Sequence, residues 1–363
     1  MDDIDMKVII YGAQGIALGA YRAYKEINPG FKLECFLVTN TKGNPQTLDG
    51  IPVIGINEYV LELSEKEKKE TKVIIATPES YMANIEKSLV EVGLLNYERL
   101  DSEKWAELIK NALSISKEFS LLSDLSSGDE KSDISVYLTK FWKDKDLISE
   151  CTLPNYYIPI QAGAENTSVR VASITDDSGD NISCKNPNYS ELTVLYWIWK
   201  NVLLGASEKA YFGLAHYRRY LMIEEDNLSG FARGNVDVVL PYPMPYEPNM
   251  EEHHKRYLSE VEWSAVLQAL KELQPDYYDK LDDILGQQYM FNYNIIVAKR
   301  MALEEYCNWL FPILFRVESI VDPNGVLTPN RYIGYIGETL ETIYFMYNKD
   351  NLNIVVTGCK FLL

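Results

Sequence analysis

The first hundred residues alternate short apolar segments with helix-like ones, and this alternation constrains the fold more than any other feature. Lys7–Tyr11 and Lys72–Thr77 are rich in β-branched residues, which is typical of buried strands. Helices are expected over Asn84–Val92 and Ser102–Leu113. Strands that alternate with helices form a parallel sheet with helices on its faces. We therefore expect a Rossmann-like α/β domain over residues 1–113.

The residue composition changes beyond this region. Residues 114–132 are dense in Ser, Asp, Glu and Lys, which predicts an interdomain linker. Five of the six tryptophans and most of the 26 tyrosines follow residue 133. A helix is expected over Ser190–Leu204, with Ser190 as its cap, and a buried strand over Ala210–Ile223. A chain of 363 residues accommodates two domains, so we expect the second over residues 133–363.

The charge balance excludes some partners. Lys and Arg number 35 against 53 Asp and Glu, a net charge of −18. Nucleic acid is therefore not expected as a partner, because binding phosphates along a duplex needs a basic face. The three histidines are His216, His253 and His254, too few and too clustered for an HExxH zinc site.

The five cysteines form no CxxC pair and are widely spaced, which favours a reduced intracellular chain. The acidic N-terminus is unlike a signal peptide, and the longest apolar runs are too short to cross a bilayer. We expect a cytoplasmic protein, with peripheral contact at the inner face of the cell membrane as a further expectation.

Glycines follow the first predicted strand, at the start of the first helix. Gly12 and Gly15 belong to a GxxGxxxG pattern rather than the GxGxxG fingerprint, and the second strand ends in Asn40 without a following acid. Glycines at such a turn let a phosphate approach backbone N–H groups, which makes Gly12 and Gly15 candidates for binding a nucleotide or nucleotide-sugar. The alternative is a turn whose glycines serve packing, and the spacing disfavours NAD.

An acidic turn precedes the Ser190 helix. Asp176, Asp177, Asp180 and Asn181 lie in it, and Lys185 follows shortly. Such a loop suits a divalent cation, or a ribose and a uracil edge; the alternative is an exposed acidic turn.

His216, Arg218 and Arg219 end the apolar run that starts at Ala210. Guanidinium groups present fixed, charge-assisted donors to phosphate oxygens, so we interpret these residues as a clamp on a diphosphate. Ion pairing with the nearby acidic run Glu224–Asp226 is the alternative. The hexamer Glu251–Arg256 is typical of a solvated loop or helix start; contact with an anionic acceptor is the alternative.

A glycine-punctuated segment, Arg331–Glu341, precedes a predicted C-terminal helix. Glu338 would lie in its first turn, either as a general base or as a charge that stabilises the helix N-terminus.

Four motifs occur in order and together resemble a known family: residues 174–201, 211–221, 293–315 and 332–344. That family has long been catalogued as a domain of unknown function. Its members are encoded among capsule, exopolysaccharide and O-antigen biosynthesis enzymes and are described as glycosyltransferases, some of them galactofuranosyltransferases. The resemblance covers residues 133–346. The first domain is similar to the small Rossmann-like modules that precede sugar acetyltransferases.

The resemblance implies a GT-A-like glycosyltransferase domain that moves a hexose, such as galactofuranose, from a UDP-sugar to a lipid-diphosphate-linked oligosaccharide. The acidic loop (Asp176, Asp177 and Asp180) would hold the nucleoside. His216 and the two arginines would replace a metal at the leaving diphosphate, so no metal or other cofactor is expected. Glu338, Glu191 and Asp180 are candidates for the base that deprotonates the acceptor.

Two other functions stay open at this point. One is a non-catalytic nucleotide-sugar-binding protein that regulates or scaffolds the same pathway. The other is an NAD-dependent oxidoreductase.

Overall fold

The computed structural model describes residues 7–128, 130–147, 152–325 and 329–362. The chain divides into two compact units. Of the described residues, unit 1 comprises 7–119 and Met244–Glu247, and unit 2 comprises those within Ser120–Pro243 and Pro248–Leu362. Cys151 lies outside the described residues, and the four described cysteines are free thiols.

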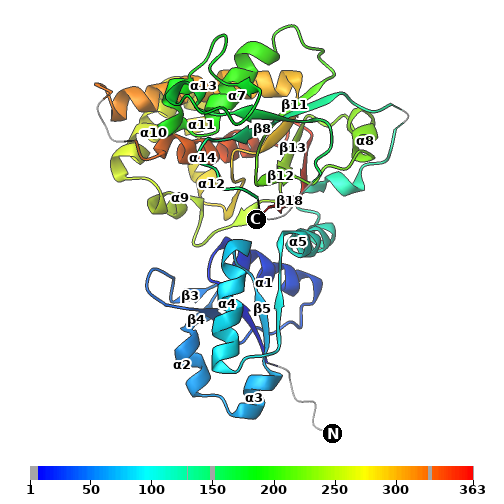
Figure 1. The fold of residues 1–363 in the computed structure, drawn as a ribbon, viewed down its shortest axis with the longest axis vertical. Helices are drawn as coiled ribbons and strands as arrows, with labels where there is room; N and C mark the ends of the chain where they lie inside the picture. Colours follow the sequence, from blue (N-terminus) through cyan, green and yellow to red (C-terminus); the bar gives the residue numbers. More distant parts are fainter. Residues whose placement is uncertain (1–6, 129, 148–151, 326–328, 363) are drawn as a thin grey trace. The chain divides into compact units, whose positions relative to one another are not determined.

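Unit 1 is a six-stranded sheet in the order β3-β4-β2-β1-β5-β6 (Figure 1). The pairs among β4, β2, β1, β5 and β6 are parallel, and β3 pairs antiparallel with β4. Its strands are β1 (Val8–Tyr11), β2 (Phe36–Val38), β3 (Thr47–Leu48), β4 (Ile51–Gly55), β5 (Lys72–Ile75) and β6 (Tyr97–Arg99). The expected α/β parallel sheet is therefore confirmed.

The helices of unit 1 follow local signals. Ser64 and Glu67 form a capping box at α3, Asp101 accepts the Lys104 N–H at the start of α5, and Gly93 ends α4 in a left-handed conformation. The helices are α1 (Gly15–Ile27), α2 (Ile56–Leu61), α3 (Glu65–Glu70), α4 (Glu79–Val92) and α5 (Ser102–Ser116).

Unit 2 is built on a ten-stranded mixed sheet in the order β10-β9-β8-β11-β16-β13-β17-β7, with β12 joining β11 to β18. Along the main path the pairs are parallel, except that β16 is antiparallel to both neighbours. The strands are β7 (Ser120–Leu121), β8 (Ile134–Lys140), β9 (Tyr157–Gln161), β10 (Ile174–Thr175), β11 (Tyr211–His216), β12 (Arg219–Leu221), β13 (Val238–Pro241), β16 (Ile296–Lys299), β17 (Ile354–Thr357) and β18 (Cys359–Phe361).

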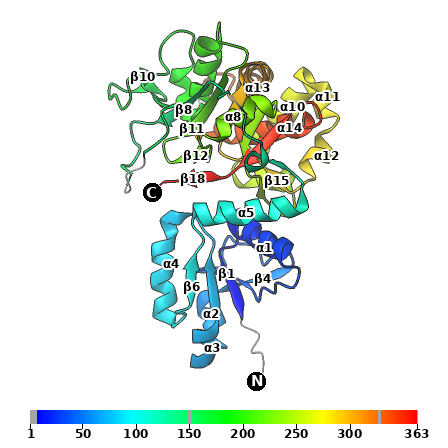
Figure 2. The ribbon, with the colours of Figure 1, turned by 90° about the vertical axis from the view of Figure 1, so that its right-hand side faces the viewer.

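Helix α13 packs against both α10 and α14 beside this sheet (Figure 2). The α-helices of unit 2 are α6 (Asn186–Tyr189), α7 (Leu192–Trp197), α8 (Asn227–Arg233), α9 (Met250–His253), α10 (Glu260–Leu273), α11 (Pro275–Tyr278), α12 (Leu281–Leu285), α13 (Arg300–Val321) and α14 (Tyr332–Tyr347). The remaining described strands are β14 (Met244–Pro245), which belongs to unit 1, and β15 (Tyr289–Met290).

Several local expectations differ from the structure. Residues 114–132 include the end of α5, strand β7 and a 3-10 turn at Leu122–Asp124; β7 pairs with β17, so it belongs to the unit 2 sheet. Ser190 does not cap α7: it has a φ of 51°, Glu191 occupies the N-cap, and the Ser190 hydroxyl accepts from Arg331 Nε. Glu338 lies in the second turn of α14, because that helix begins at Tyr332.

Candidate active site

A half-buried cluster of charged side chains lies at the junction of several elements of unit 2. β11 ends at His216, and the hairpin that follows places Arg219 opposite it at the start of β12. Glu191 occupies the N-cap of α7, and Glu338 comes from α14. The charges of Glu191 and Arg219 both act on His216 and on Glu338, so these four predicted residues are brought together.

Glu338 has the electrostatics of a general base. Burial raises its pKa to about 7, and the Glu191 charge raises it further, against a hydrogen bond from the Tyr293 backbone and the charges of Arg219 and Arg331. An acid–base group acts best when its pKa lies near the working pH. Glu338 can therefore exchange protons near neutral pH, which an ordinary surface glutamate cannot.

Two further polar groups in the cluster lack protein partners. Glu341 is 1% exposed, neither of its carboxyl oxygens has a hydrogen-bond partner, and burial next to Glu338 raises its pKa well above normal. His216 Nε2 is also buried without a partner, and burial lowers the pKa of this imidazole. Buried polar groups are normally hydrogen-bonded, so this concentration of unsatisfied atoms makes the cluster a candidate binding site.

Three residues of the cluster carried no role in the sequence interpretation: Asn294, Arg331 and Glu341. Asn294 Nδ2 donates to Glu191 Oε1 at 2.6 Å and to the Gly334 carbonyl at 3.1 Å, which fixes the Glu191 carboxylate. Both Asn294 and Arg331 have positive φ angles, of 50° and 65°. Non-glycine residues in that conformation are uncommon and concentrate at functional sites, but a sequence does not reveal them.

Asp176, by contrast, stabilises its own loop through hydrogen bonds. It is fully buried, and its carboxylate accepts four hydrogen bonds: from the Gly163 and Ala164 backbone N–H groups, at 2.8 and 3.0 Å, and from the Ser183 and Thr193 hydroxyls, at 2.5 and 2.6 Å. A carboxylate with four donors from its own chain has no free lone pair for a ligand.

The other residues of the acidic turn have nearby protein partners. Asp177 pairs with Arg170 at 3.2 Å, and Asp180 accepts from the Tyr196 hydroxyl at 3.1 Å. The Asn181 side chain accepts the Ser183 N–H. Lys185, just beyond the turn, forms an ion pair with Glu318 at 2.6 Å.

Arg218 lies in the turn between β11 and β12 and Arg219 begins β12, and the two side chains have different surroundings. Arg219 packs its guanidinium over Tyr293, 4.4 Å from the ring centroid, within the cluster. Arg218 donates to the carbonyl oxygens of Lys145 and Asp146. The predicted arginine pair is thus divided between two environments, and Arg331 is the second guanidinium whose charge acts on Glu338.

Gly12 and Gly15 of unit 1 both lie in tight packing. Gly12 has a φ of 133°, and a Cβ there would lie 2.5 Å from the Ala76 carbonyl oxygen. A Cβ on Gly15 would lie 2.6 Å from Met244 Cγ, because the Met244–Glu247 segment of the same unit passes over the start of α1. Packing alone is therefore sufficient to require both glycines.

The hexamer Glu251–Arg256 forms the end of α9 and a 3-10 turn, and its four other residues are exposed, but both of its histidines are buried. His254 stacks on Trp263 with ring centroids 4.0 Å apart. Burial lowers the pKa of His253 to about 4.

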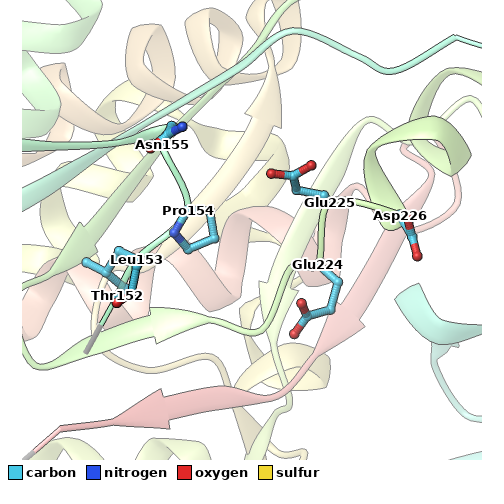
Figure 3. A pocket seen from close by; sticks show the side chains of 7 residues that line it. All are labelled: Thr152, Leu153, Pro154, Asn155, Glu224, Glu225 and Asp226. Carbon is cyan, nitrogen blue, oxygen red and sulfur yellow. The ribbon is translucent and has the colours of Figure 1, made fainter. Parts of the chain in front are cut away.

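A hollow of about 460 Å³ lies elsewhere in unit 2, between residues 152–155 and the acidic run Glu224–Asp226. Figure 3 shows the three carboxylates following one another along their loop.

Across the described parts of the chain, no three or more His, Cys, Asp or Glu side chains are grouped so as to hold a metal ion. None of the described helices has the length and apolar character that a bilayer crossing requires.

The family model for the domain of unknown function DUF4422 matches residues 144–349. This match spans more than half of the sequence and includes the whole charged cluster, so the chain belongs to the DUF4422 family.

Among solved structures, the chain is similar to one described as the apo form of the bifunctional glycosyltransferase WbbM. The two share 24% identity and a TM-score of 0.52, over 63% of this chain and 45% of that one. The chain therefore matches less than half the length of that protein, and the likeness supports the fold. No curated protein matches.

Proposed function

We propose that this protein is a glycosyltransferase of surface polysaccharide assembly, with its active site at the Glu338 cluster. The observation that carries this proposal is Glu338 itself, a half-buried carboxyl with a pKa near 7 that faces Arg219 and Arg331. Sugar transfer to a hydroxyl needs a base for the acceptor and positive charge for the departing diphosphate. The cluster supplies both.

In this mechanism Glu338 removes the proton of the acceptor hydroxyl as that oxygen attacks the anomeric carbon of a UDP-hexose, such as UDP-galactofuranose. Arg219 and Arg331 stabilise the charge that develops on the diphosphate, and His216 Nε2 lies free to donate or accept beside them. Fixed guanidinium groups in a half-buried site provide this stabilisation without a metal ion. The proposed acceptor is a lipid-diphosphate-linked oligosaccharide.

Thermal shift with a panel of UDP-sugars, followed by measurement of UDP release with and without acceptor, tests the assignment. We expect one donor to raise the melting temperature and to be consumed, with activity retained in EDTA. Activity that disappears in EDTA and returns with Mn²⁺ would overturn the metal-independent mechanism. Tight binding of a UDP-sugar without turnover would favour the alternative, a non-catalytic binding protein.

A further inference from the structure

The helix that carries Glu338 reaches solvent along one narrow stripe. From Tyr332 to Phe345, every residue of α14 is buried except Tyr335 and Glu338. These two lie three positions apart and therefore on one helix face, and the exposed Arg331 precedes them at the N-cap of the helix. Tyr335 therefore lies beside Glu338 on the part of α14 that is not fully buried.

A second tyrosine covers Tyr335 from outside. The Tyr257 ring stacks on it with centroids 4.9 Å apart and an interplanar angle of 26°. Tyr257 is 49% exposed, and the Glu338 charge acts on its hydroxyl, so the pair stands beside the proposed base. The far end of the pair is flanked by Arg331, whose guanidinium carbon is 5.8 Å from the Tyr335 ring.

The outer tyrosine is held in place by its own segment. The Tyr257 N–H donates to the His254 carbonyl at 3.0 Å, and the buried His253 ring packs edge-on against the Tyr257 ring at 5.4 Å. His254 in turn stacks on Trp263 of α10. An aromatic ring that is half in water and rigidly supported from behind presents a fixed apolar face to a ligand.

We propose that Tyr257 and Tyr335 form the wall of an acceptor subsite that takes the ring of a saccharide. A sugar ring has an apolar face of C–H groups, which packs on the electron-rich face of an aromatic ring, while its hydroxyls stay available to Glu338. Arg219 and His216 come from the β11–β12 hairpin, and the tyrosine pair comes from α14 and the segment before α10. We therefore assign the hairpin side of Glu338 to the donor diphosphate and the tyrosine side to the acceptor, with Arg331, which flanks Tyr335, at the boundary between the two. This assignment rests on the proposed function and names its acceptor side.

Saccharide binding can be measured without turnover, by saturation-transfer NMR in the presence of UDP. The probes are methyl glycosides of galactose, glucose, mannose and rhamnose. We expect at least one to bind the wild type, and Tyr257→Ala to weaken that binding by about tenfold or more. Tyr257→Phe keeps the ring and should bind within about threefold of wild type. Tyr81→Ala removes another exposed tyrosine, in α4 of unit 1, and is the matched control.

The outcomes separate this proposal from the proposed function. Absence of glycoside binding in the wild type, or unchanged binding in a folded Tyr257→Ala variant, would overturn the acceptor subsite. A loss of UDP affinity in Tyr257→Ala, with glycoside binding intact, would also overturn it, because the ring would then belong to the donor. Failure of the wild type to consume any UDP-sugar would instead count against the transferase, whatever the glycosides do.

Discussion

Two carboxylate-rich regions of unit 2 look alike in the sequence and differ in the structure. In the acidic turn, Asp176 is surrounded by four donors from its own chain, and Asp177 is paired with Arg170. In the α14 cluster, Glu341 has no partner for either oxygen, and Glu338 carries a pKa raised to about 7. The carboxylates of the acidic turn are hydrogen-bonded or ion-paired within their own loop. Those of the α14 cluster are only partly satisfied by the protein.

This difference gives a physical criterion for separating structural from functional carboxylates. Burial of a charge is unfavourable unless hydrogen bonds or ion pairs compensate for it. Asp176 has that compensation, so its burial needs no ligand. The Glu338 cluster has only part of it, so the cluster lowers the stability of the fold, as is typical of functional sites.

The largest expected effect is on activity when Glu338 is neutralised. Glu338→Gln keeps the shape of the side chain but cannot accept a proton, so we expect the rate of sugar transfer to fall by about 10²- to 10⁴-fold. Initial rates of UDP release in the presence of acceptor provide the measurement.

Glu272→Gln is the matched control, since Glu272 pairs with Arg316 on the surface and should leave the rate unchanged. If the Glu338→Gln protein retained wild-type activity, Glu338 would not be the base, and the difference between the two regions would not separate structural from functional carboxylates.

The next largest effect is expected on the stability of the acidic turn around Asp176. Asp176→Asn replaces an acceptor oxygen by an amide that faces N–H and O–H donors, so we expect the free energy of unfolding of unit 2 to fall by about 3 kcal/mol. Denaturant unfolding followed by tryptophan fluorescence measures this. A stable variant with selective loss of UDP affinity would instead place Asp176 in the binding site.

Much of the fold was predictable because local signals and long-range packing agree. The β-branched segments Val8–Tyr11 and Lys72–Ile75 form parallel strands, and Ser259 begins α10 with a capping box. Residues 114–132 illustrate the opposite case. Their polar composition predicts a linker, yet Ser120–Leu121 is a strand, since pairing with β17 outweighs local preference.

The site was predictable in its chemistry and not in its grouping. Glu191, His216, Arg219 and Glu338 were each selected from separate motifs, and tertiary structure alone brings them together. Glu341 escaped notice because its position in α14 reads as part of a buried helix face. The surroundings of Asp176 could not be predicted for a related reason: a sequence shows a carboxylate but does not show which donors surround it.

A smaller effect concerns the pH dependence of the rate. Glu338 acts as a base only when ionised, so activity should rise with pH and reach half its maximum near pH 7. The Glu191 charge raises the pKa of Glu338, so Glu191→Gln should move the acidic limb of the kcat/KM profile to lower pH. A shift to higher pH, or no shift in an active variant, would contradict the proposed coupling within the cluster.

The smallest effect is expected in the acidic turn, and it sharpens the contrast between the regions. Asp177 pairs with Arg170, whose side chain is 47% exposed, and accepts from the Thr175 hydroxyl. Exposed ion pairs contribute little, because water screens the charges and ordering long side chains costs entropy. We therefore expect Asp177→Asn to lower the free energy of unfolding by about 1 kcal/mol or less and to change the donor KM by less than about twofold. A rise in donor KM of tenfold or more at unchanged stability would show that the acidic turn binds the nucleotide. The Glu338 cluster would then bind the sugars alone.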